Sequence, residues 1–170
     1  KRPEPDTHFD PDAGHNWRHL ETPGAEATLA AIATLLAKKL PSLGITHAEM
    51  QLISPVNTSG ELSCQTLNAL AKSIMNPAQP HSRLPFAVAD RVVRLKNANV
   101  KLRDPPPPPQ PESCRIVNGD IGTCTGIDDQ HVTVQFADPD RHVRLPRVGH
   151  NLALAYCLTA HKMQGSQARL

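Results

Sequence analysis

Aromatic residues are scarce in this chain of 170 residues, because Phe, Tyr and Trp together make up only 3% of it. A nucleic-acid-binding surface built mainly from rings that stack on bases is therefore not expected. The formal net charge is only +2, which excludes a histone-like polycation but neither requires nor excludes a local basic groove. No apolar run has transmembrane length and no signal-peptide pattern occurs, so we expect a cytoplasmic protein without a membrane partner.

Two motifs with well-understood chemistry are also missing. The four cysteines form no Cys-x-x-Cys pair and stand at no zinc-finger spacing from histidine. We therefore expect no metal site and interpret them as small buried or free thiols. No Gly-x-x-x-x-Gly-Lys-Ser/Thr phosphate-binding loop occurs, and no acidic pair suited to Mg²⁺ follows a strand. We expect residues 1–170 to carry no catalytic residue and to hydrolyse no ATP alone.

Proline, in contrast, is abundant, with 17 residues, six of which lie between Pro105 and Pro111. Proline donates no backbone hydrogen bond and fixes φ, so residues 104–111 can be neither helix nor central strand. We interpret them as a stiff polyproline II loop. Docking of an SH3 or WW domain on this run is the alternative.

The hydrophobic pattern of both ends of the chain predicts an α/β layer. Residues 1–20 are polar and are interpreted as a tail or linker. Apolar residues at helical spacing predict helices over residues 24–40 and 61–75, with a short buried strand over residues 50–56 between them. The nearly continuous apolar run of residues 152–159 predicts one further buried parallel strand.

The middle of the chain predicts a different structure. Short strands separated by Gly, Asn, Asp or Pro are expected over residues 91–96, 116–117, 122–127, 132–136 and 143–145. Such a series is typical of a small β-barrel, in which residues 104–111 form an enlarged loop. The expected organisation is an α/β domain of residues 21–85 plus 150–170, interrupted by a β insertion of residues 86–149.

A polar segment follows the last predicted strand. Thr159, Ser166 and the backbone near Gly165 can donate hydrogen bonds to phosphate oxygens, and Lys162 adds a positive charge. The carboxyl end of a parallel strand is also where α/β proteins place ligands. Taken alone, the segment fits an ordinary polar loop equally well.

The run Leu154-Ala-Tyr-Cys-Leu-Thr-Ala-His-Lys-Met-Gln-Gly-Ser166 resembles motif V of the RecD-like helicases of superfamily 1. Residues 51–56 resemble the strand that carries motif IV, and residues 91–97 and 117–122 resemble the opening strands of the family's SH3-like insertion. These pieces occur in family order over about residues 20–170. The resemblance implies a partial RecA-like parallel-sheet domain with an inserted small SH3-like β-barrel.

The function that this resemblance implies is 5′ to 3′ movement along single-stranded DNA, driven by ATP and Mg²⁺ in the intact protein. The chain would be the C-terminal motor portion and bind no cofactor alone. Its partners would be single-stranded DNA, a missing N-terminal RecA-like domain and, as a further option, other helicase or nuclease subunits. The resemblance assigns DNA contacts to Thr159, His161, Lys162 and Ser166, and coupling to the nucleotide to Gln164 and Gly165. Met163 and Gln167 depart from the family pattern, which weakens a nucleotide contact by Gln167.

Basic residues flank the predicted insertion on both sides. We assign DNA binding to Arg91, Arg94 and Lys96, and note further cations at Lys101, Arg103, Arg141, Arg144 and Arg147. They fit a track for a DNA strand and a solvated barrel face about equally well. The chain begins without Met and ends just after the polar segment, so we expect a piece of a larger protein. The rival function is a non-catalytic nucleic-acid-binding or protein-docking module with a helicase-derived fold.

Overall fold

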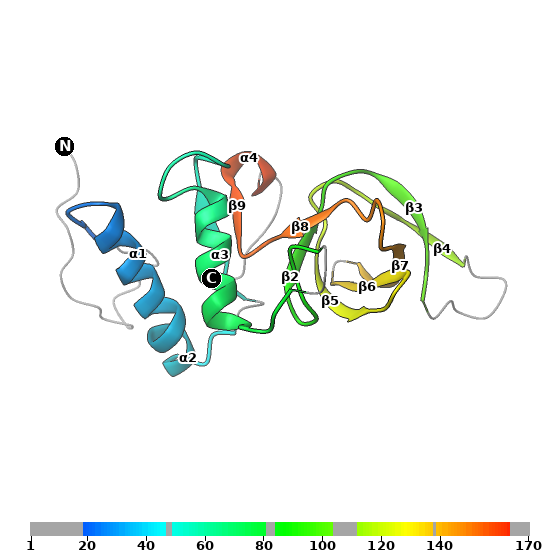
Figure 1. Ribbon diagram of the computed structural model, residues 1–170, viewed down its shortest axis with the longest axis horizontal. Coiled ribbons are helices and arrows are strands. Elements are labelled where there is room, and N and C mark those ends of the chain that lie inside the picture. Colours follow the sequence, from blue (N-terminus) through cyan, green and yellow to red (C-terminus); the bar gives the residue numbers. More distant parts are fainter. Residues whose placement is uncertain (1–18, 47–48, 81–83, 104–111, 138, 164–170) are drawn as a thin grey trace.

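The computed structural model describes residues 19–46, 49–80, 84–103, 112–137 and 139–163. It has a mixed α/β architecture, with a small parallel sheet and separate antiparallel sheets. Figure 1 shows most of the helices at one end of the molecule and the antiparallel strands at the other end. Within the described ranges, no helix is long and apolar enough to cross a membrane.

The first helical segment agrees with the helix expected over residues 24–40. It consists of α1 (Ala25–Thr34), a π-helical turn η1 (Leu35–Lys39) and the short α2 (Leu40–Ser42). Leu36, on η1, is buried in a cluster that also contains Ala71 and Tyr156. The segment therefore packs through apolar contacts on α3 and on the residue that precedes β9.

The parallel sheet has two strands, β1 (Leu52–Ser54) and β9 (Cys157–Thr159). Leu52 pairs with Cys157 and Ser54 pairs with Thr159, so both strands end at the same edge. Helix α3 (Cys64–Met75) follows β1 and begins at the N-cap Ser63, whose side chain accepts a hydrogen bond from the Thr66 amide. The strand expected over residues 50–56 and the helix expected over residues 61–75 are both present.

The apolar run of residues 152–159 forms two strands, and the prediction of one buried parallel strand was wrong. Strand β8 (Leu152–Leu154) pairs antiparallel with β2 (Arg91–Arg94), and the chain then continues into β9. The Ala155 amide still donates to the Arg91 carbonyl, whereas the Tyr156 carbonyl already accepts from Leu52. The run is continuously apolar because its first half is buried in one sheet and its second half in another. The apolar pattern therefore did not reveal that the chain passes from one sheet to the other.

Seven strands form what we call the β unit, β2 to β8. Five of them make an antiparallel sheet of order β7-β6-β5-β2-β8, while β3 and β4 pair as a separate hairpin. The strands not yet given are β3 (Ala98–Lys101), β4 (Ser113–Ile116), β5 (Ile121–Ile127), β6 (His131–Ala137) and β7 (Asp140–Pro146). The sheet and the hairpin share one apolar core, which includes Phe86, Ile116, Val134 and Phe136. The sequence did not predict β3, and the Pro-rich residues 104–111 lie outside the described residues, between β3 and β4.

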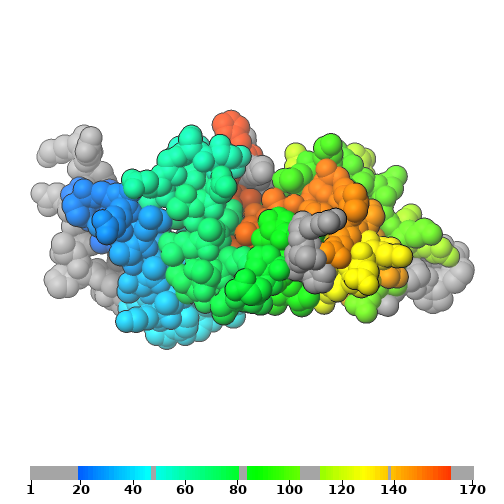
Figure 2. Space-filling view, viewed as in Figure 1, coloured from blue at the N-terminus to red at the C-terminus, as the bar shows by residue number. Residues whose placement is uncertain are grey.

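A buried carboxylate joins the helical part to the β unit. Asp90 is fully buried and accepts hydrogen bonds from Lys72 Nζ at 2.6 Å, Asn76 Nδ2 at 2.8 Å and the Tyr156 hydroxyl at 2.8 Å. The Ala87 amide donates to it as well, at 2.7 Å. Figure 2 shows described residues that lie between α3 and β2 in the chain, in green, between the two parts in that view.

Candidate nucleic-acid interface

A cleft runs between α3 and the strands β8 and β9, and Thr159 lines it at the carboxyl end of the parallel pair. We call it the strand-end cleft. It has a volume of about 340 Å³ and is lined by Asn57, Thr58, Cys64, Gln65, Asn68, Ala69, Pro85, Ala153, Leu154, Cys157, Leu158 and Thr159. Its walls are thus mostly apolar, with a few amide and hydroxyl groups, as is usual for ligand sites.

The loop that follows β1 is tied to the start of α3. The Ser54 hydroxyl donates to the Leu62 carbonyl at 2.7 Å, and the Val56 amide donates to the same hydroxyl at 3.2 Å. The Cys64 amide in turn donates to the Val56 carbonyl at 2.8 Å. These bonds hold the loop residue Asn57 at the rim of the strand-end cleft.

Strand β9 pairs with β1 along one edge and with a side chain along the other. Asn68, on α3, donates to the Cys157 carbonyl at 2.9 Å and accepts from the Cys157 amide at 2.9 Å. One amide side chain therefore satisfies both backbone groups that a third strand would otherwise pair. This role of Asn68 was not predicted from the sequence. The available signal was an Asn on the same helix as the buried Leu67 and Ala71.

The structure describes only some of the residues that resemble motif V. Thr159 is half-buried and lines the strand-end cleft, and His161 is exposed on the short helix α4 (Ala160–Met163). For Lys162 only the helical backbone is described. Gln164, Gly165 and Ser166 lie outside the described residues, so their assigned contacts stay predictions.

The three basic residues assigned around β2 have different surroundings. Arg91 is half-buried, and its Nη1 donates to the Met50 carbonyl. Arg94 is only 5% exposed and donates to the carbonyls of Lys96 and His150. Burial lowers the pKa of both guanidinium groups from the ordinary value. Both arginines thus bond to backbone of segments next to the strands, whereas Lys96 is exposed just after β2. Their DNA contacts stay predictions.

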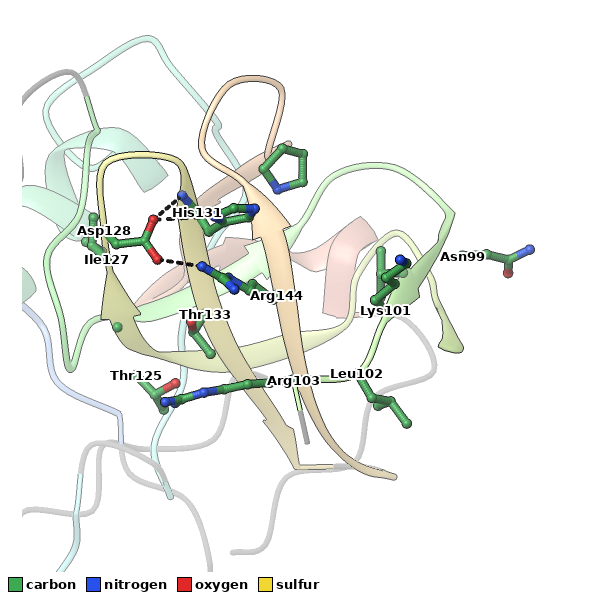
Figure 3. A pocket seen from close by; sticks show the side chains of 13 residues that line it. Asn99, Lys101, Leu102, Arg103, Thr125, Ile127, Asp128, His131, Thr133 and Arg144 are labelled. Carbon is green, nitrogen blue, oxygen red and sulfur yellow. Dashed lines mark hydrogen bonds and ion pairs between the residues drawn. The ribbon is translucent and has the colours of Figure 1, made fainter. Parts of the chain in front are cut away.

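A second cleft lies on the β unit. It is lined by three of the other basic residues that were noted around the predicted insertion, Lys101, Arg103 and Arg144. We call it the β-unit cleft. It has a volume of about 800 Å³ and is lined by Asn99, Val100, Lys101, Leu102, Arg103, Thr125, Gly126, Ile127, Asp128, His131, Thr133, Arg144 and Pro146. Figure 3 shows Arg103 extending toward Thr125 and Arg144 pointing to Asp128.

No family model matches the chain, and a search of the curated proteins finds no significant relative. Within the ranges that the structure describes, no group of three His, Cys, Asp or Glu side chains could hold a metal ion.

The charge balance of the β-unit cleft is positive. Arg144 forms an ion pair with Asp128 at 3.1 Å, while Lys101 is exposed at the end of β3 and Arg103 is exposed just after it. The backbone amides of Gln130 and His131, together with Arg144, lower the pKa of Asp128 to about 2, so this residue stays ionised at neutral pH. Three cations against one anion form a surface that attracts a polyanion.

The remaining arginines predicted around the insertion contact groups of the chain itself. Arg141 pairs with Asp120 at 3.1 Å and lies over the Phe136 ring. Arg147 donates to the Asp129 carbonyl at 3.5 Å. The basic residues noted around the insertion therefore fall into two groups. Some line the β-unit cleft, and the others bond to groups of the β unit itself.

Proposed function

We propose that this chain is the second RecA-like portion of a RecD-like DNA helicase, with an inserted SH3-like barrel, and that it contacts the phosphates of single-stranded DNA. The observation that carries the proposal is the parallel pairing of β1 with β9, although the whole β unit lies between them in sequence. This arrangement supports the order of motifs that the sequence suggests. It also brings Thr159 to a cleft at the strand ends.

In this proposal the Thr159 hydroxyl donates to a phosphate oxygen, and the basic residues of the β-unit cleft attract a neighbouring stretch of the strand. ATP and Mg²⁺ bind between this domain and an N-terminal RecA-like domain in the intact protein. Gln164 and Gly165 couple the DNA contact to that nucleotide site. The chemistry of hydrolysis is supplied by residues of the other domain.

Thr159→Val tests the strand-end contact, because valine keeps the shape of threonine and has a methyl group in place of its hydroxyl. Loss of one hydrogen bond to a charged phosphate is expected to weaken binding of a fluorescent oligo-dT about tenfold. Fluorescence anisotropy at fixed ionic strength measures the change.

Thr123→Val is the matched control, since Thr123 lies on β5 outside the residues that line the strand-end cleft. It should bind oligo-dT as the unchanged chain does. Equal affinities for the Thr159 and Thr123 variants would refute the strand-end contact. A chain that does not bind oligo-dT at all would instead favour a protein-docking module.

Lys101→Ala combined with Arg103→Ala tests the β-unit cleft. If each side chain neutralises one phosphate, the slope of log affinity against log salt should become shallower by about 1.4 for single-stranded DNA. The affinity of the double variant for single-stranded DNA at low salt should also be lower than that of the unchanged chain. A salt titration of the same anisotropy assay gives both values.

The control removes two charges from the other end of the molecule. Lys38 and Lys39 are exposed on η1, far from the β unit in Figure 1. Lys38→Ala with Lys39→Ala changes the net charge by the same amount and should leave the slope unaltered. Equal changes in both double variants would mean that net charge, and not the cleft, determines binding.

A further inference from the structure

Two cysteines from distant parts of the sequence meet beside the strand-end cleft. The sulfur atoms of Cys64 and Cys157 are 3.6 Å apart, although the residues are 93 positions apart in the chain. Cys64 is the first residue of α3, and Cys157 is the first residue of β9. Their exposed fractions are only 4% and 1%, but both line the cleft of about 340 Å³. A small oxidant can therefore reach them through that cleft.

We infer that Cys64 and Cys157 are a redox-active dithiol, which a peroxide converts into a disulfide that fixes α3 to β9 and which thiol reductants reopen. To form the bond, the two sulfurs must approach from 3.6 Å to about 2.05 Å. The inference does not rest on the proposed DNA contact.

The chemistry assigns different roles to the two sulfurs. Burial, together with the neighbouring Cys64 sulfur, raises the pKa of the Cys157 thiol to about 12, and this thiol donates a hydrogen bond to Cys64. One of the two sulfurs attacks hydrogen peroxide first, which gives a sulfenic acid and one water molecule. The other sulfur then displaces the hydroxyl group as a second water molecule while the S–S bond forms. Two thiols lose two electrons, and one peroxide gains them.

The other two cysteines lie elsewhere and provide an internal reference. Cys124 is buried in the core of the β unit, where burial raises its thiol pKa to about 11. Cys114 lies on β4 and packs against the same core. Neither lines the strand-end cleft, so neither is expected to join the disulfide.

Peptide mapping of the 170-residue chain tests the inference directly. The protein is treated with a small excess of hydrogen peroxide, alkylated, and digested without reduction. We expect one cross-linked peptide pair, Cys64 with Cys157, that is two hydrogens lighter than the free peptides and separates on reduction. Cys114 and Cys124 should be recovered alkylated. Recovery of Cys64 and Cys157 as free thiols or sulfinic acids, a cross-link to another cysteine, or a disulfide-linked dimer would overturn the inference.

Thermal melting supplies the second measurement. Because the disulfide closes a long loop, oxidation should raise the melting temperature of the unchanged chain by at least about 5 °C. Cys64→Ala should abolish this shift, and Cys114→Ala should retain it. If Cys64→Ala does not fold, Cys157→Ala takes its place, and the mapping of the unchanged chain stands without either variant. The absence of a shift despite a mapped cross-link would refute the locking of α3 to β9.

Discussion

Replacing Asp90 with alanine is expected to lower the free energy of unfolding by about 3–5 kcal/mol, because one partner of a buried ion pair is removed and the other is left behind. The Asp90 side chain is fully buried, and that of Lys72 is 11% exposed. Without the carboxylate, Lys72 Nζ keeps two carbonyl acceptors, at Asn76 and Ala78, but no negative charge. Urea denaturation monitored by circular dichroism measures the loss.

Further groups depend on the same carboxylate. The Tyr156 hydroxyl donates to Asp90. Burial is the main cause that raises the pKa of Tyr156 above its ordinary value, and the hydrogen bond to Asp90 is the second cause. The Asn76 amide and the Ala87 amide donate to Asp90 as well. Each buried donor left without an acceptor costs about 1–3 kcal/mol, unless water enters to replace the carboxylate. The loss should therefore lie in the upper part of the expected range if the site stays dry.

Asp129→Ala is the control, since Asp129 is exposed in the turn before β6. Its effect should stay within about 0.5 kcal/mol. A second control is the rescue of Asp90→Asn by Lys72→Met, which removes the uncompensated ammonium. The double variant should be more stable than Asp90→Asn alone. Destabilisation of Asp90→Ala below about 1 kcal/mol would show that this cluster does not hold the two parts together.

Elements whose pattern is complete within a few residues could be predicted from the sequence. Helix α3 has its own N-cap Ser63 and a stripe of apolar residues, and both lie within one stretch of chain. Strands β5, β6 and β7 are bounded by Gly, Asn or Asp turns. Local propensity and burial agree in these elements, so no knowledge of the partner strand was needed.

Contacts between distant residues could not be predicted. The run of residues 152–159 is equally apolar in β8 and β9, and only the pairing partners reveal that it changes sheets. Asp90 and Lys72 are ordinary charged residues in the sequence, which usually lie in solvent. Cys64 and Cys157 have no motif spacing at all, since the fold of the whole chain between them brings them together.

In the candidate site, too, local features could be predicted from the sequence and contacts between distant residues could not. The position of Thr159 at the end of a buried strand was predicted from the apolar run that precedes it, and it lines a cleft. The positive charges of Arg91 and Arg94 were evident from the sequence, but the orientation of their side chains was not. In the fold, the Arg91 side chain donates to the Met50 carbonyl and that of Arg94 to the His150 carbonyl, so both bond to backbone of neighbouring segments.

The glycines of the segment Asn118-Gly-Asp-Ile-Gly122 have a structural explanation that the resemblance did not supply. Gly119 has φ of 98°, a left-handed conformation suited to the turn before β5. Gly122 is needed for a different reason, since a Cβ atom there would lie 2.5 Å from the Gln135 carbonyl oxygen. The same atom would lie 2.8 Å from Val134 Cγ1.

Gly122→Ala is therefore expected to destabilise the chain by at least about 2 kcal/mol, because backbone and core atoms must move to admit one methyl group. The obstructing carbonyl belongs to β6, which is paired on both edges and cannot shift alone. A lower urea midpoint with an unchanged slope would report this loss of stability without a change in the extent of unfolding.

Gly126→Ala on the same strand is the matched control, because its added Cβ would lie 3.7 Å from the nearest atoms, those of Thr133. That is an ordinary contact, and the variant should be unchanged or more stable by about 0.5 kcal/mol through the lower entropy of its unfolded chain. Equal effects at both positions would mean that the close approach of β5 and β6 at Gly122 is not what requires glycine. A large loss at Gly122 alone assigns that residue to the packing of the β unit, so reduced DNA binding by this variant would follow from lost structure and not from a lost contact.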